Sequence, residues 1–106
     1  MSITSLKGML DGALARHGIR RQVAAAMIVV KANEVLTAML VRPLVDDVRA
    51  LSFRDGHLVL ACRHAAAAYD AHTIVDALAE RLGESMPDAN ILAIDVRVNP
   101  EPWREW

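Results

Sequence analysis

Apolar and polar side chains alternate along residues 48–54, which are rich in strand formers, and this period of two predicts a β-strand. Residues 57–63, an apolar stretch between His57 and Arg63, are expected to return as the partner strand. Asp55 and Gly56 lie between the strands, and both residue types tolerate the positive φ that a type I′ turn requires. We therefore expect an antiparallel hairpin at the centre of the chain.

The apolar period changes to that of a helix after residue 64. Apolar residues at helical spacing predict a helix from Ala65 to Leu82, with Gly83 ending it. Residues 91–98 alternate again and predict a third strand. One face of this strand carries Leu92, Ile94, Val96 and Val98, and the other carries Ala93, Asp95 and Arg97.

Two helices are expected before the hairpin. A stripe of apolar residues from Ile3 to Leu14 predicts the first helix, which Gly18 would end. The second would run from Arg20 to about Val41, because Pro43 cannot continue a helix. Its apolar arc is too wide for a helix lying on a surface. It should be the central core helix or also contribute to a subunit interface.

The expected order is therefore helix, helix, strand, strand, helix, strand. This order predicts a KH-like α+β fold, with a three-stranded sheet and helices packed on one face. At 106 residues and 54% hydrophobic content, the chain has enough apolar surface for one core. We expect a single domain over residues 1–99 and an extended Pro/Trp tail over residues 100–106.

Location and redox state are constrained by two features. No uninterrupted apolar run reaches the ~20 residues of a membrane span, and the N-terminus lacks the apolar region of a signal peptide. Cys62 is the only cysteine, which excludes an intramolecular disulfide framework. These features predict a cytoplasmic protein with no membrane contact.

Charge is unevenly distributed, although the net charge is only −1. Residues 1–64 hold nine Lys/Arg and five Asp/Glu, whereas residues 65–106 hold three and eight. No phosphate-binding loop and no GXXG loop occurs, so nucleic-acid contacts would use arginines on phosphates. The candidates are Arg16, Arg20, Arg21, Arg49, Arg54 and Arg63. The alternative is that these charges only coat a solvated surface; Phe53 could likewise stack on a base or belong to the core.

Catalytic and metal chemistry have few candidates. Cys62, His64 and His72 supply a thiol and two imidazoles, but no acid, base and oxyanion set converges with them. Their spacing matches no zinc motif, and a fourth ligand is lacking. We expect no catalytic residue, no metal and no cofactor.

Trp103 and Trp106 lie at the end of the chain. They could fold back over the open side of the sheet, or they could anchor a protein partner, because Trp is enriched at interface hot spots. Removing residues 100–106 would separate the two readings, since only an internally docked tail supports thermal stability.

Asp55-Gly56 is followed by the strand His57-Leu58-Val59-Leu60-Ala61-Cys62, then by the small residues 65–68 and a helix that ends at Gly83. This pattern resembles the DciA-type family of bacterial replicative-helicase loaders. The upstream helices and the last strand fall in the same order as in that family, which has a KH-like domain. The resemblance implies a non-enzymatic adaptor that binds single-stranded or duplex DNA weakly and engages a replicative helicase. From the residues alone, a protein-interaction or homodimerisation module without nucleic-acid binding remains the alternative.

Overall fold

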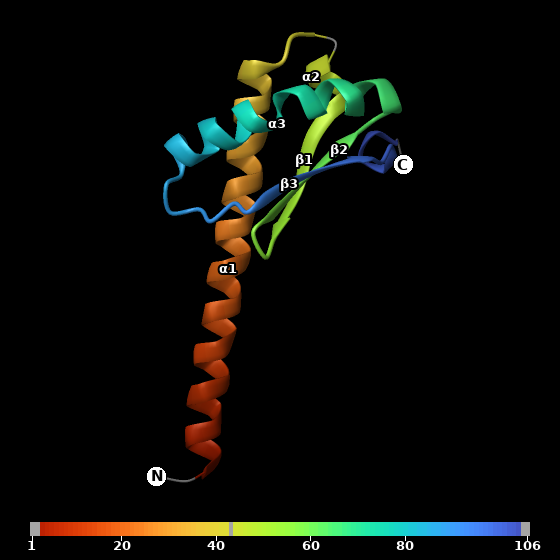
Figure 1. The fold of residues 1–106 in the computed structure, drawn as a ribbon. Coiled ribbons are helices and arrows are strands. Elements are labelled where there is room, and N and C mark those ends of the chain that lie inside the picture. Colours follow the sequence, from red (N-terminus) through yellow and green to blue (C-terminus); the bar gives the residue numbers. More distant parts are fainter. Residues whose placement is uncertain (1–2, 43, 105–106) are drawn as a thin grey trace.

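The computed structural model describes the backbone of residues 3–42 and 44–104, and the side chains of residues 18–42 and 44–104. Its elements are helix α1 (Ile3–Met39), the single turn α2 (Leu44–Asp47), strands β1 (Val48–Arg54) and β2 (His57–Cys62), helix α3 (Ala65–Ser85), strand β3 (Ala93–Val98) and the 3-10 turn η1 (Glu101–Trp103). The chain thus forms a small α+β domain, and the predicted order of elements holds in outline (Figure 1).

The sheet is three-stranded and mixed, in the order β1-β2-β3. β1 and β2 are antiparallel, which confirms the hairpin, and Asp55 and Gly56 have φ values of 51° and 83° as a type I′ turn requires. β2 and β3 are parallel. A parallel pair needs a crossover connection, and α3 provides it.

The core lies between one face of the sheet and the helices α1 and α3 (Figure 1). Alternate residues of β2, namely Leu58, Leu60 and Cys62, are fully buried on this face. Ile94 and Val96 of β3 pack against the same cluster, as the alternation predicted. The expectation that helices cover one face is therefore confirmed.

The two N-terminal helices that the sequence predicted are one helix. α1 continues through Gly18 without a left-handed residue, so the predicted break there was wrong. A glycine inside a helix costs only about 1 kcal/mol relative to alanine, and nothing at Gly18 forces a turn. The helix ends at Met39, two residues earlier than predicted. Its N-terminal part extends well past the hairpin turn (Figure 1).

Two further boundaries differ from the prediction. α3 continues past Gly83 to Ser85, and the backbone N–H of Met86 closes it by bonding to the Leu82 carbonyl. β3 begins at Ala93 instead of Ile91. The N–H groups of Leu92 and Ala93 both donate to the carbonyl of Gly56 in the turn, at 2.7 and 3.2 Å, so the chain joins the sheet at this point.

α1 carries apolar residues on both its inner and its outer side. The inner side packs on the sheet through Ile28, Ala32, Val35, Leu36 and Leu40, as expected of a core helix. The segment Gly18–Met39 is long and apolar enough, by length and composition, to cross a membrane, although the charged residues within it leave no uninterrupted apolar run. Packing of its inner side on the sheet is equally typical of the core helix of a water-exposed domain.

Candidate functional site

The structure divides the predicted arginine set between two ends of the domain. Arg20 and Arg21 lie on α1 near the hairpin turn, and Arg54 lies at that turn. Arg49 and Arg63 lie at the other end of the hairpin, because Val48 pairs with Cys62. The side chain of Arg16 lies outside the described residues. The arginines therefore do not form one continuous basic face.

Two members of the first group, Arg21 and Arg54, line a groove of about 970 Å³ between α1 and the end of the hairpin. Arg21 contributes to the helix wall and Arg54 to the strand wall, although 33 positions separate them in the sequence. Arg54 is 90% exposed, and its Nε lies 3.8 Å from Asp55, which is also exposed. Such an exposed pair contributes little and leaves the guanidinium available to a ligand. Polar and apolar side chains complete the groove, among them Gln22, Ser52, Phe53, Asn90 and Leu92.

Phe53 packs against the core, which is one of its two predicted roles, and stacking on a base stays a prediction. It is half-buried and packs against the core cluster, and it also lines the groove. An aromatic ring in this position can offer an edge or a face to a base that enters the groove, while its remaining surface supports the fold.

Arg49 is held by the C-terminal tail. Its guanidinium carbon lies 5.0 Å from the centroid of the Trp103 ring, and its Nη1 donates to the carbonyl of Pro102 at 3.1 Å. The Trp103 indole N–H donates to the carbonyl of Asp46 at 2.7 Å. Trp103 is thus docked on the domain, in agreement with the internal-docking alternative, whereas Trp106 lies outside the described residues. Arg49 is less free to bind phosphate than the groove arginines.

Arg63 belongs to a small cluster where β2 meets α3. Its Nη1 lies 3.8 Å from Asp47, and the same carboxylate lies 3.2 Å from Nε2 of His64. Nδ1 of His64 accepts the backbone N–H of Ala67 at 3.1 Å, so this histidine caps the start of α3. Capping explains His64 without any catalytic role.

Cys62 is fully buried on the helix-covered face of the sheet, and burial raises the pKa of its thiol. A raised pKa keeps the thiol protonated and therefore poorly nucleophilic. His72 is exposed on α3, so the three residues do not converge. Within the part of the chain that the structure describes, no three His, Cys, Asp or Glu side chains are placed to hold a metal ion.

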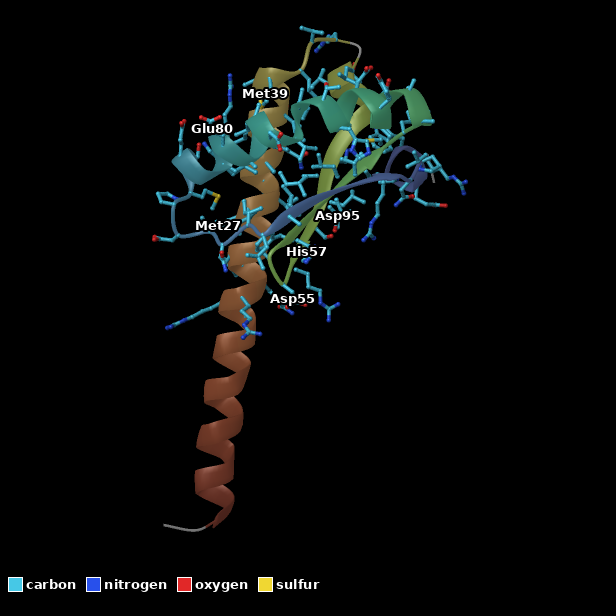
Figure 2. The ribbon with its side chains drawn as sticks, viewed as in Figure 1. Met27, Met39, Asp55, His57, Glu80 and Asp95 are labelled. Carbon is cyan, nitrogen blue, oxygen red and sulfur yellow. The ribbon has the colours of Figure 1, made fainter. Side chains whose placement is uncertain are left out.

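A group of polar residues on the open face of the sheet was not among the predicted sites. Nδ1 of His57 lies 3.3 Å from Oδ2 of Asp95, and Nη2 of Arg97 lies 3.9 Å from the same oxygen. Figure 2 shows His57 and Asp95 beside each other on neighbouring strands, near the end of the hairpin that carries Asp55.

Arg97 and Arg49 both pair with Ala61, so they lie on the same open face. The outward alternation of residues 93, 95 and 97 was the signal that could have identified Arg97 as a further cation.

The geometry therefore offers one groove with arginines on both walls, a docked tail and an open sheet face with mixed charges. Comparison of the chain with protein-family models and with curated proteins finds no match to either.

Proposed function

We propose that this domain is a non-enzymatic adaptor that binds nucleic acid weakly through phosphate contacts and engages a protein of DNA replication. The observation that carries the nucleic-acid part is the position of Arg21 and Arg54 on the two walls of one groove, with Arg20 exposed beside it. The replication part rests on the resemblance to DciA-type helicase loaders and on reading the α+β fold as KH-like. That resemblance makes a replicative helicase the expected partner.

The groove suits a phosphate backbone better than it suits a compact ligand. Two planar guanidinium groups can each take two phosphate oxygens, and the groove is partly open to solvent. Because the net charge of the chain is −1, no overall field draws in a polyanion, and affinity must come from these local contacts. Few contacts mean weak binding with a modest dependence on salt.

Fluorescence anisotropy with labelled single-stranded and duplex DNA tests this proposal at 50 and 200 mM salt. Three phosphate contacts on a duplex predict a loss of affinity of about 40-fold between these two concentrations. The double variant Arg21→Gln/Arg54→Gln should lose most of the affinity and most of this dependence.

Arg81→Gln/Arg97→Gln is the matched control, because it removes the same charge from α3 and β3, outside the groove. Absence of binding at 50 mM salt, or equal losses in the two double variants, would contradict the assignment of the groove.

A second candidate function is a homodimerisation or protein-interaction module. It is favoured by the large apolar side chains that α1 exposes on its outer side, Ile19, Val23, Met27 and Val30. Light scattering at micromolar concentrations tests it, because a monodisperse monomer over the whole range would argue against self-association.

A further inference from the structure

α1 has a second apolar face, opposite the one that packs on the sheet. Ile19, Val23, Met27 and Val30 are 53–59% exposed, and we call these four residues the outer stripe. They follow one another at intervals of four, four and three, so they share one side of the helix. At 100° per residue, this side is turned by about 150° from the inner residues Ile28, Ala32 and Val35. Single exposed apolar residues are common on proteins, whereas an aligned series indicates a binding surface.

We propose that a second copy of this chain packs on the outer stripe, with the two α1 helices antiparallel and Met27 of both copies at the two-fold axis. The proposal rests on the second candidate function and specifies its surface. A two-fold axis makes the same patch serve both copies, so the stripe has to be complementary to itself. Residues 23 and 30 lie on either side of position 27, and each would contact the α1 helix of the second copy near the same axis.

The charges beside the stripe match this antiparallel arrangement. Arg20 and Glu34 are each seven residues from Met27, so both lie within about 20° of its direction around the helix. In an antiparallel pair with Met27 at the axis, positions equally far before and after Met27 face each other, so Arg20 of each copy meets Glu34 of the other. Parallel helices in register would instead place Arg20 and Glu34 about 21 Å apart along the axis.

The rest of the domain leaves room for this partner. The sheet packs on the inner side of α1, and the outer stripe itself is exposed. The end of α3 lies beside the C-terminal part of α1, where Glu34 lines a hollow with Arg81 and Glu84. Among the ion pairs between described residues, Glu34 contacts only Lys31, at 3.4 Å and in an exposed position. Such a surface pair is weak enough for Glu34 to contact a second cation across the dimer.

Sedimentation velocity and light scattering on the full chain, between 1 and 100 μM, test the dimer itself. The expected result is twice the mass of the chain. Val23→Glu/Val30→Glu should give a monomer with unchanged far-ultraviolet circular dichroism, because both side chains are exposed. Tyr69→Glu is the control, since this residue is 75% exposed on α3 and should leave the dimer intact.

A charge exchange tests the direction of the two helices. Arg20→Glu and Glu34→Arg should each raise the dissociation constant about tenfold, because each places like charges together twice in the dimer. The double variant Arg20→Glu/Glu34→Arg should restore it. Additive losses in the double variant would overturn the antiparallel pairing.

Cysteine cross-linking gives a second measure of direction that does not depend on charge. Met27→Cys should form an intermolecular disulfide under mild oxidation, because the two copies meet at this position. Ile19→Cys should not, since antiparallel helices hold the two copies of residue 19 about 24 Å apart along the axis. Cross-linking of both variants would indicate parallel helices and overturn the proposal.

These experiments also distinguish failure of the proposed surface from failure of the candidate function on which it rests. A monomer at 100 μM overturns homodimerisation and, with it, this proposal, whereas a dimer that Val23→Glu/Val30→Glu leaves intact overturns the surface alone. A membrane is the competing occupant of the stripe. The chain would then float with phosphatidylcholine vesicles, and the Val23→Glu/Val30→Glu variant would not. That result would mean that the stripe binds a lipid surface and not a second copy, and it would overturn the proposal.

Discussion

The side chain of Asn33 makes two hydrogen bonds to the backbone of Ala50. Its Nδ2 donates to the Ala50 carbonyl at 3.1 Å, and its Oδ1 accepts the Ala50 N–H at 2.8 Å. β1 is an edge strand, whose outward backbone groups have no neighbouring strand to pair with. The amide of Asn33 replaces that strand at one position and attaches α1 to the sheet.

Asn33→Ala should lower the free energy of unfolding by about 2 kcal/mol, because it removes two partly buried hydrogen bonds and leaves both Ala50 groups unpaired. Urea denaturation measures the change. Thr37→Ala is the control, since Thr37 is exposed and bonds only to a carbonyl of its own helix. Equal and small effects of both substitutions would mean that the amide does not stabilise the edge strand.

Gly56→Ala and Gly83→Ala should change stability in opposite directions. A Cβ at Gly56 would lie 2.7 Å from Cγ of Leu92, and the φ of 83° is unfavourable for alanine, so we expect a loss of at least about 1 kcal/mol. At Gly83 a Cβ meets nothing within 4 Å inside a helix, so alanine should stabilise the domain by up to about 1 kcal/mol. Thermal denaturation of both variants checks the two signs, and a gain at Gly56 would contradict the turn geometry.

His64 should be found in the tautomer that carries its proton on Nε2. Nδ1 accepts the Ala67 N–H, which leaves Nε2 to donate to Asp47. Nitrogen NMR of the imidazole at neutral pH measures the tautomer directly. His64→Ala should cost about 1 kcal/mol through loss of the cap, whereas His64→Asn should retain most of the stability, because asparagine is a good N-cap residue.

Removal of residues 100–106 should lower the melting temperature by several degrees. The tail contributes the Arg49–Trp103 contact and the hydrogen bond from the Trp103 indole to Asp46. A loss of about 1 kcal/mol corresponds to a shift of roughly 4–8 °C in a domain of this size. Trp103→Ala should reproduce most of this shift, and Tyr69→Ala should not, because Tyr69 is largely exposed. An unchanged melting temperature would favour the reading of the tail as a partner anchor.

Cys62 should react with thiol reagents only when the protein unfolds. Burial raises the pKa of its thiol in the folded state, so the thiolate forms at lower pH in the unfolded chain than in the folded one. Stability should therefore be constant below the thiol's ordinary pKa and should decrease as the pH rises above it, by at most about 1.4 kcal/mol per pH unit. Alkylation rates with and without urea test the first statement, and unfolding between pH 7 and 10 tests the second. Cys62→Ser removes the titrating thiol and should flatten this pH dependence.

The sequence by itself determined the local structure wherever a short pattern has one solution. Asp55-Gly56 between alternating strands specifies a hairpin, and the outward alternation of β3 places Asp95 and Arg97 on the open face. The predicted helix ends at Gly18 and Gly83 differ from the structure, because a glycine can either end a helix or lie within it at a small cost. Their roles depend on what surrounds them.

Only the tertiary structure decided which of the arginines act together. Strand register places Arg49 and Arg63 at one end of the hairpin, and the packing of α1 on the sheet places Arg21 opposite Arg54. It also decided that Trp103 docks on the domain and that the outer stripe of α1 stays exposed. These relationships join residues far apart in the chain, and no local period carries information on which distant surfaces meet. Their geometry follows from burying one apolar face of each element in a shared core.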